Sequence, residues 1–218
     1  MLDSKPDEYT ALPEGGVGPG VLVLHAWWGL TGFVRQVCDR LAAEGYVALA
    51  PDLYHGEIVT TIAEAKKLSG RLDGQAARAE IVAALERLMH LPATRGERAG
   101  VIGFSLGAYF ALWLADRRPR DVAAVVVFYG TSGLRFRKMQ AACQGHFAEH
   151  DSYEPPDGVQ RVYDRLLAAG REVTFYTYPG TGHWFFEQDR PDAYDRQAAE
   201  IAWQRTTAFL KETLGTVD

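Results

Sequence analysis

The sequence predicts an α/β fold in which helices flank a mostly parallel, doubly wound sheet. Short apolar runs alternate with amphipathic helical patterns along most of the 218 residues. The runs are apolar at successive positions, as in strands that are covered on both faces. No repeat, low-complexity tract or linker interrupts this alternation. We therefore expect one domain over residues 1–218, with residues 1–18 as an N-terminal extension.

In the first part of the chain, each strand is expected at a β-branched or aliphatic run and each helix where apolar residues recur every three or four positions. In order, these elements are a strand at Val21 to Ala26, a helix at Phe33 to Glu44, a strand at Tyr46 to Ala50, helices at Ile62 to Ser69 and Gln75 to His90, a strand at Arg98 to Phe104, a helix at Leu106 to Asp116 and a strand at Val122 to Tyr129.

The second part continues the same alternation. The expected elements are a strand near Gln144 to Ala148, a helix from Gly158 to Ala169, a strand from Glu172 to Tyr178 and a final helix from about Ala193 to Leu214. Gly170 and Gly180 follow two of these elements and are typical of element ends. The chain thus predicts a sheet of about six strands or more.

Composition and charge exclude several classes of function. Lysine and arginine are scattered and the net charge is −5, so no nucleic-acid partner is expected. Residues Met1 to Glu14 are acidic and turn-rich, unlike a secretory signal, and no apolar run is long enough to span a membrane. Cys38 and Cys143 are expected to be buried, reduced thiols. We expect a cytoplasmic monomer without membrane contact.

Residues Gly103 to Gly107 carry the strongest functional signal. The order Gly-x-Ser-x-Gly lies between a predicted strand and a predicted helix, as in a nucleophile elbow that exposes a serine hydroxyl on a sharp turn. Gly103, Gly107 and Ala108 are small, as such a turn requires. The amide of Leu106 would start the helix and face a developing oxyanion. A second amide is expected from the loop His25 to Gly29, and Ser105 is the candidate nucleophile.

A serine nucleophile needs a base and an orienting acid, and both follow in the order known for such folds. His183 lies in a glycine-rich loop after the last predicted strand and is the candidate base. Asp151 follows the strand before it and is the candidate acid, with Glu149 as the alternative because both side chains share one face of an extended strand. Asp151 could instead cap a turn before Pro155.

We expect neither a metal site nor an organic cofactor. His146 and His150 lie near Asp151, but residues four apart on an extended strand are separated by roughly 13 Å, too far to share one ion without a turn. No motif for an organic cofactor is present in the sequence.

The chain resembles the dienelactone hydrolase family of the α/β-hydrolase superfamily. The resemblance covers nearly the whole chain and rests on six segments in matching order: VLVLHAWWGL from Val21, LAAEGYVALAPDLYHG from Leu41, VIGFSLGA from Val101, VVFYG from Val126, HFAEHD from His146 and YPGTGHWFF from Tyr178. It implies an α/β-hydrolase fold with the triad Ser105, Asp151 and His183, and oxyanion amides from Trp27 and Leu106.

Three departures from the family pattern concern mechanism and substrate. The resemblance implies a cysteine where this chain has Ser105 and a glutamate where it has Ala26, and the paired change fits an ordinary serine cycle. It also implies a substrate-binding arginine where this chain has Glu187. We expect Glu187 to repel an acidic lactone.

The expected activity is hydrolysis of small carboxylic esters or lactones. The connection between Tyr129 and Gln144 is too short for a large lid domain, so the site should be fairly open. Its candidate lining is aromatic, either contacting an apolar or aryl group or packing beneath the loops. These candidates are Trp27, Trp28, Tyr54, Trp184 and Phe185. A thioesterase or peptidase, and a non-catalytic ligand-binding protein of the same fold, are the alternatives.

Overall fold

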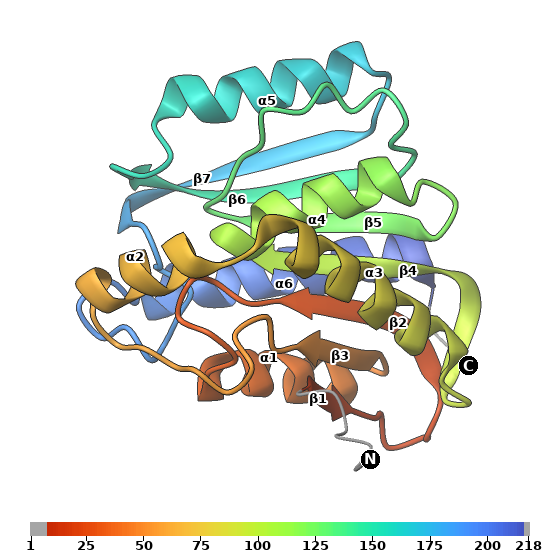
Figure 1. The fold of residues 1–218 in the computed structure, drawn as a ribbon. Helices are drawn as coiled ribbons and strands as arrows, with labels where there is room; N and C mark the ends of the chain where they lie inside the picture. Colours follow the sequence, from red (N-terminus) through yellow and green to blue (C-terminus); the bar gives the residue numbers. More distant parts are fainter. Residues whose placement is uncertain (1–7, 216–218) are drawn as a thin grey trace.

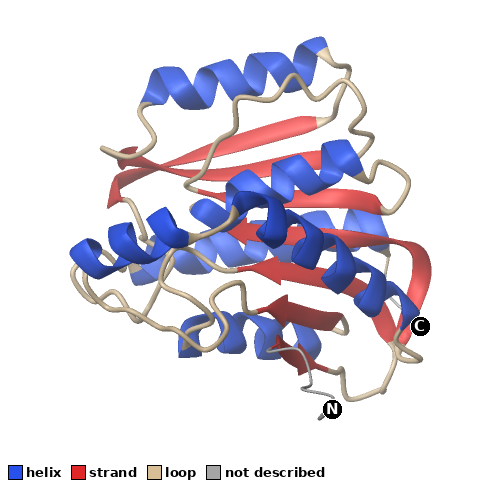
Figure 2. Cartoon of the chain, viewed as in Figure 1, coloured by secondary structure: helices blue, strands red, loops and turns tan. Residues whose placement is uncertain are grey.

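A computed structural model describes residues 8–215, which form a seven-stranded sheet with helices on both faces (Figures 1 and 2). The strand order is β1-β3-β2-β4-β5-β6-β7, and every neighbouring pair is parallel except β1 and β3. The strands are β1 (Glu8–Ala11), β2 (Gly18–Leu24), β3 (Val47–Pro51), β4 (Thr94–Phe104), β5 (Val122–Phe128), β6 (Ala142–His150) and β7 (Val173–Gly182). The helices are α1 (Gly32–Ala43), α2 (Ile62–Arg71), α3 (Gly74–His90), α4 (Leu106–Arg117), α5 (Pro156–Ala168) and α6 (Arg196–Leu214).

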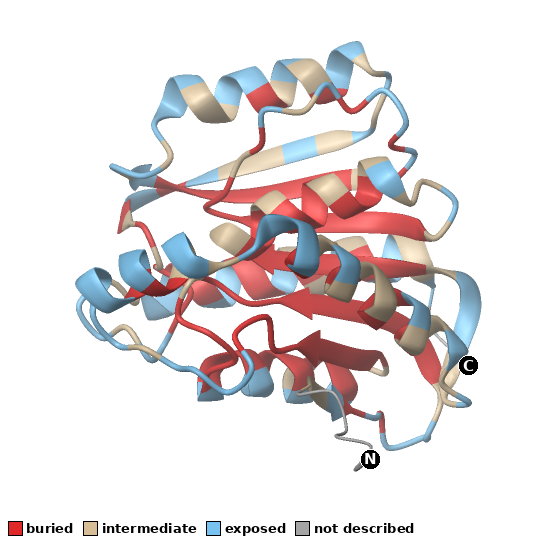
Figure 3. Cartoon of the chain, viewed as in Figure 1, coloured by how far each residue is buried: buried red, intermediate tan, exposed pale blue. Residues whose placement is uncertain are grey.

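The two faces of the sheet bury separate apolar clusters because side chains alternate along each strand. On β2, Val21 and Val23 pack in the cluster that includes α1 and α6, whereas Leu22 and Leu24 pack in the cluster that includes α3, α4 and α5. Figure 3 shows buried residues concentrated in the central strands and on the inner sides of the helices. The expectation of strands covered on both faces is therefore confirmed.

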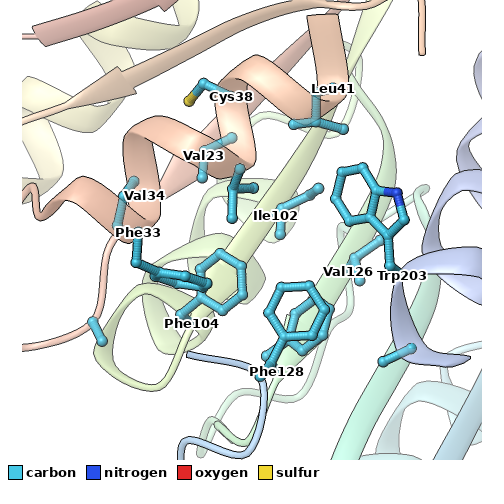
Figure 4. Close-up of a cluster of buried hydrophobic side chains, with 14 of the residues drawn as sticks. Val23, Phe33, Val34, Cys38, Leu41, Ile102, Phe104, Val126, Phe128 and Trp203 are labelled. Atoms are coloured by element: carbon cyan, nitrogen blue, oxygen red, sulfur yellow. The ribbon is translucent and has the colours of Figure 1, made fainter. Parts of the chain in front are cut away.

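Aromatic side chains form a connected group within the α1–α6 face of the core (Figure 4). Phe104 stacks on Phe128 with ring centroids 4.8 Å apart and meets Phe33 edge-on at 5.1 Å. Phe104 ends β4 directly before Ser105, and Phe128 ends β5. Large rings in close contact resist displacement, so this cluster fixes the ends of the two central strands.

Part of the N-terminal extension expected over residues 1–18 forms regular structure. Glu8–Ala11 pairs antiparallel with β3 as an edge strand, and β2 begins at Gly18. A four-residue, mostly polar strand has little hydrophobic pattern to reveal it. Residues 1–7 lie outside the described part of the chain.

The remaining elements match the expectations apart from their ends. β4 begins at Thr94 rather than Arg98, and α6 begins at Arg196 rather than near Ala193. Cys38 and Cys143 are buried thiols outside any disulfide. Between residues 8 and 215, every helix is too short or too polar to cross a bilayer.

Parallel strands place their carboxyl ends at one edge of the sheet, where α/β folds bind ligands. Ser105 directly follows β4, Asp151 directly follows β6, and His183 directly follows β7. Three residues separated by up to 78 positions in the chain thereby reach the same edge.

Candidate active site

Ser105 lies on a strained turn between β4 and α4. Its backbone has φ 49° and ψ −109°, in the left-handed region that a residue with a side chain seldom adopts. Its amide donates to the carbonyl of Phe128 at 2.9 Å, which fixes the turn to the neighbouring strand. The strain and its support are those of a nucleophile elbow.

The two flanking glycines allow this turn because backbone occupies the space of their missing side chains. A Cβ on Gly103 would lie 2.3 Å from the carbonyl oxygen of Gly107, and one on Gly107 would lie 2.1 Å from that of Leu24. Neither backbone group can rotate away as a side chain can. The second contact also presses the start of α4 against the end of β2, just before the loop that carries Trp27.

A continuous line of hydrogen bonds joins the three candidate catalytic residues. The Ser105 hydroxyl lies 3.0 Å from Nε2 of His183, and Nδ1 of His183 lies 2.7 Å from Oδ2 of Asp151. The side chains of His183 and Asp151 are 5% and 2% exposed. A carboxylate at Nδ1 accepts a hydrogen bond from the ring N–H and so keeps the ring proton on Nδ1, which leaves Nε2 to accept the proton of the serine hydroxyl.

Asp151, not Glu149, contacts the histidine. Its second oxygen, Oδ1, accepts hydrogen bonds from the amides of Tyr153 and Glu154 at 2.9 and 3.0 Å. These two bonds form a turn that fixes the carboxylate plane. Glu149 instead accepts a bond from the amide of Gly180 at 2.8 Å, so it holds the loop that leads to His183.

The amides of Trp27 and Leu106 are available as donors. Leu106 is the first residue of α4, and the first amides of a helix have no acceptor within it. Within residues 8–215, the backbone hydrogen bonds outside regular elements use neither amide as a donor. A helix N-terminus also carries partial positive charge, which favours a developing oxyanion.

Two residues beside the candidate triad were not predicted from the sequence. The ring of Tyr153 lies over His183 with centroids 4.9 Å apart, although Tyr153 itself is 41% exposed. Glu154 accepts a hydrogen bond from the Thr131 hydroxyl at 2.6 Å and ties the Asp151 turn to the segment after β5. Burial raises the pKa of Glu154. Neither belongs to a motif, and only their proximity to Asp151 in sequence could have drawn attention to them.

A cavity of about 570 Å³ opens beside His183. Its lining combines aromatic and aliphatic side chains with polar and charged ones. The lining residues are Trp28, Thr60, Ile62, His150, Ser152, Tyr153, His183, Trp184, Asp189, Arg190, Pro191, Asp192 and Ala193. Trp28 and Trp184, both expected near the site, therefore line it.

Tyr54 and Phe185, also expected there, do not line this cavity. Tyr54 lines a separate cavity of about 250 Å³ with residues of α2 and α3. Phe185 is fully buried, between Tyr129 at 5.6 Å and Tyr178 at 4.9 Å. Trp27 does not line the cavity but contacts the rings of Trp28 and Trp184 at 5.4 and 6.0 Å. The order of elements predicted that these residues lie near the carboxyl edge of the sheet, but it did not predict the direction of their side chains.

The expectation that Glu187 repels an acidic substrate is wrong. Glu187 is 1% exposed, and its Oε1 accepts a hydrogen bond from the Tyr129 hydroxyl at 2.9 Å. Burial, and then the negative charge of Asp189, raise the pKa of Glu187 to about 8. The carboxyl is therefore largely protonated at neutral pH and belongs to the core rather than to the cavity.

The other buried histidines have structural partners. His25 donates from Nδ1 to the carbonyl of Ala26 at 2.6 Å and accepts at Nε2 from the amide of Leu53, and burial lowers its pKa. His146 is fully buried and bonded to Tyr178 and Gln144. Over residues 8–215, no cluster of three or more histidine, cysteine or acidic side chains has the arrangement of a metal site.

Comparison with known proteins identifies the family. The model of the dienelactone hydrolase family matches residues 7–214. The chain belongs to the dienelactone hydrolase family. The match extends over nearly every element of the sheet, and this family membership makes the chain a hydrolase.

Relatives of the dienelactone hydrolase family align over most of their length. "Protein usf" of Aquifex pyrophilus is 32% identical, with 94% of this chain and 93% of the relative covered. A "Putative carboxymethylenebutenolidase" of Aquifex aeolicus is 31% identical, with 94% and 93% covered. The crystal structure of a "Putative Dienelactone Hydrolase" from Klebsiella pneumoniae superposes with a TM-score of 0.84 at 25% identity, covering 94% of this chain and 92% of that one. The fold is that of the α/β hydrolases.

Proposed function

We propose that this dienelactone hydrolase family member cleaves small carboxylic esters or lactones through a serine nucleophile. The observation that carries the proposal is the hydrogen-bonded line from Asp151 through His183 to Ser105, which ends on the strained turn after β4. The name of one relative, "Putative carboxymethylenebutenolidase", denotes an enzyme that acts on a butenolide, which is a lactone.

In the first half of the reaction, the Ser105 hydroxyl attacks the substrate carbonyl while Nε2 of His183 takes its proton. The resulting tetrahedral oxyanion accepts hydrogen bonds from the amides of Trp27 and Leu106. Collapse breaks the bond to the leaving oxygen, which takes the proton from His183. The products are the alcohol, or the ring-opened hydroxyl of a lactone, and an acyl group on Ser105.

In the second half, His183 removes a proton from water as the water attacks the acyl carbonyl. The same two amides stabilise the second oxyanion, and its collapse returns the proton to Ser105 and releases the carboxylic acid. Asp151 stabilises the positive charge on His183 in both halves and holds its ring orientation through the Nδ1 bond. All proton transfers in this scheme use protein side chains and water.

The nucleophile is tested by Ser105→Ala. Hydrolysis of p-nitrophenyl acetate should fall by about 10³- to 10⁶-fold, with unchanged circular dichroism, because attack is lost while the oxyanion donors remain. Ser69→Ala, in α2 and away from the triad, is the matched control and should keep full activity. Survival of turnover in Ser105→Ala would exclude this mechanism.

A fluorophosphonate probe separates the proposal from a non-catalytic ligand-binding protein. Labelling of one serine per chain, abolished by Ser105→Ala, supports covalent catalysis. Binding of small esters without labelling would contradict it. Comparing matched esters, lactones and thioesters by kcat/KM then separates the proposed class from thioesterase or peptidase activity.

A further inference from the structure

We propose that the cavity beside His183 binds the leaving group of the ester, and that it selects a neutral or cationic aryl group over one that carries a carboxylate. The inference rests on the proposed function, since it assigns the leaving group of that reaction to the side of the reaction centre where the cavity lies. It concerns the chemical class of the alcohol that is released.

The side of the cavity follows from which residues line it. His183 lines the cavity, whereas Ser105 and the oxyanion residues Trp27 and Leu106 do not. In the proposed reaction, the leaving oxygen takes its proton from His183, so the leaving group must lie against this ring. The cavity is lined by that ring but not by the nucleophile. Its position therefore fits the alcohol portion of the substrate rather than the acyl portion.

Aromatic rings form the wall nearest the triad. Tyr153 and Trp184 both contact His183, with centroids 4.9 and 4.8 Å from its ring, and they lie 5.2 Å from each other. Trp28 lies 5.2 Å from Trp184, and Ile62 and Pro191 add aliphatic surface. Such surfaces favour a flat apolar group. A cavity of about 150 Å³ holds benzene in other proteins, so the 570 Å³ here admits a substituted aryl ring.

The charges in the cavity disfavour a carboxylate. Arg190 is the one arginine or lysine among its described lining residues, and it already has contacts, although its buried Nε has no hydrogen-bond partner. Its guanidinium stacks 3.8 Å from the ring centre of Trp28, donates to the Thr60 carbonyl at 2.7 Å and lies 3.8 Å from an oxygen of Asp189. Asp189 and Asp192 bring two negative charges to the same cavity.

A carboxylate on the leaving group would therefore meet two acidic side chains and a guanidinium that is stacked and hydrogen-bonded. The remaining histidine of the lining, His150, is exposed and lies 3.4 Å from Glu149. A cationic substituent would be attracted by Asp189 and Asp192 and by the ring faces of the wall. A neutral aryl ring carries no charge that would have to lose its hydration on entering the cavity.

Three acetate esters test this inference: 3-methylphenyl acetate, 3-(trimethylammonio)phenyl acetate and 3-carboxyphenyl acetate, with methyl acetate as the non-aryl reference. Each kcat/KM is divided by the rate constant for hydroxide-catalysed hydrolysis, which removes the intrinsic reactivity of the leaving group. We expect the neutral and cationic aryl esters to exceed the carboxylate ester by about tenfold. Equal normalised values, or a preference for the carboxylate, would overturn the inference.

Asp192→Asn tests the charge argument against the matched variant Asp157→Asn. Asp157 is an exposed aspartate in the first turn of α5 and does not line the cavity. Asp192→Asn should narrow the ratio between cationic and carboxylate esters by about threefold, and Asp157→Asn should leave that ratio as in the wild type. The same change of ratio in both variants would show that the cavity does not make the selection.

Binding of the free phenols separates this inference from the proposed function. In Ser105→Ala, 3-methylphenol and 3-hydroxybenzoate are titrated while tryptophan fluorescence is followed, because Trp28 and Trp184 line the cavity. We expect the neutral phenol to bind more tightly. An enzyme that hydrolysed no ester would overturn the proposed function even if the phenol bound. One that hydrolysed all four esters without discrimination, and bound neither phenol preferentially, would overturn this inference alone.

Discussion

His146 lies on β6 and His183 directly follows the adjacent strand β7. Both side chains are buried and bonded at both ring nitrogens, yet their surroundings suit different tasks. The partners of His146 are uncharged: Tyr178 at Nδ1, and Gln144 and Thr206 at Nε2. Burial lowers the pKa of His146 to about 3. His183 has a carboxylate on one side and a hydroxyl on the other. Burial, aided by the positive charge of Arg205, thus keeps His146 neutral, whereas His183 has a negatively charged partner at Nδ1.

The largest expected effect comes from removing that carboxylate. Asp151→Asn should lower kcat by about 10⁴-fold while the chain stays folded, since the amide no longer holds the reactive tautomer of His183. Glu149→Gln is the matched control and should change kcat less than about threefold, because Glu149 contacts the amide of Gly180. Steady-state kinetics with p-nitrophenyl acetate measures both. If the two variants lost activity in the reverse order, Glu149 would be the orienting acid.

Glu187 extends the comparison to a buried acid with an uncharged partner. Its pKa of about 8 in the folded chain exceeds the ordinary glutamate value. The folded state therefore holds a proton that the unfolded state loses between about pH 4.5 and 8, and stability should fall as pH rises through that window. The loss should approach about 5 kcal/mol at most.

Urea denaturation of the wild type and Glu187→Gln between pH 5 and 9 measures this loss. The glutamine can still accept the bond from Tyr129 and has no proton to lose, so its stability should change less with pH over the same range. Parallel stability curves for the two proteins would show that Glu187 is ionised at neutral pH.

The smallest effect is expected at His146. His146→Phe keeps the stacking on Phe128, at 4.6 Å, but leaves Gln144 and Thr206 without their partner. The free energy of unfolding should fall by about 1–3 kcal/mol, and kcat/KM should stay within about threefold of the wild type. His183→Phe should show the opposite pattern. A loss of activity in folded His146→Phe beyond tenfold would mean that this histidine also serves the reaction.

The fold was predictable wherever burial imposed a pattern. The apolar runs of β2, β3, β4 and β5 are covered on both faces, so their sequences show them directly. β1 and the start of β4 were missed because Glu8–Ala11 and Thr94–Glu97 are partly exposed and polar. Hydrophobic pattern carries little information about such segments.

The positions of the candidate site residues were predictable where a residue's place in the chain also determines the direction of its side chain. Ser105 and His183 follow strand ends and reach one edge by topology alone, and the order of elements places Asp151 with them. The prediction that Glu187 faces the substrate was wrong because the turn after His183 directs its side chain into the core, where it contacts Tyr129. Tyr153 and Glu154 act through contacts between separate loops, and one sequence does not encode such contacts in a readable pattern.

The backbone contacts around Gly103 and Gly107 have a consequence for how this family could diversify its chemistry. The position of residue 105 is set by main-chain atoms of α4, β2 and β5 rather than by its own side chain. A hydroxyl and a thiol can therefore be exchanged at the same point without rebuilding the scaffold. A backbone position fixed in this way can carry either a serine or a cysteine, and substitutions in the neighbouring loops can then adjust the proton transfer to the nucleophile present.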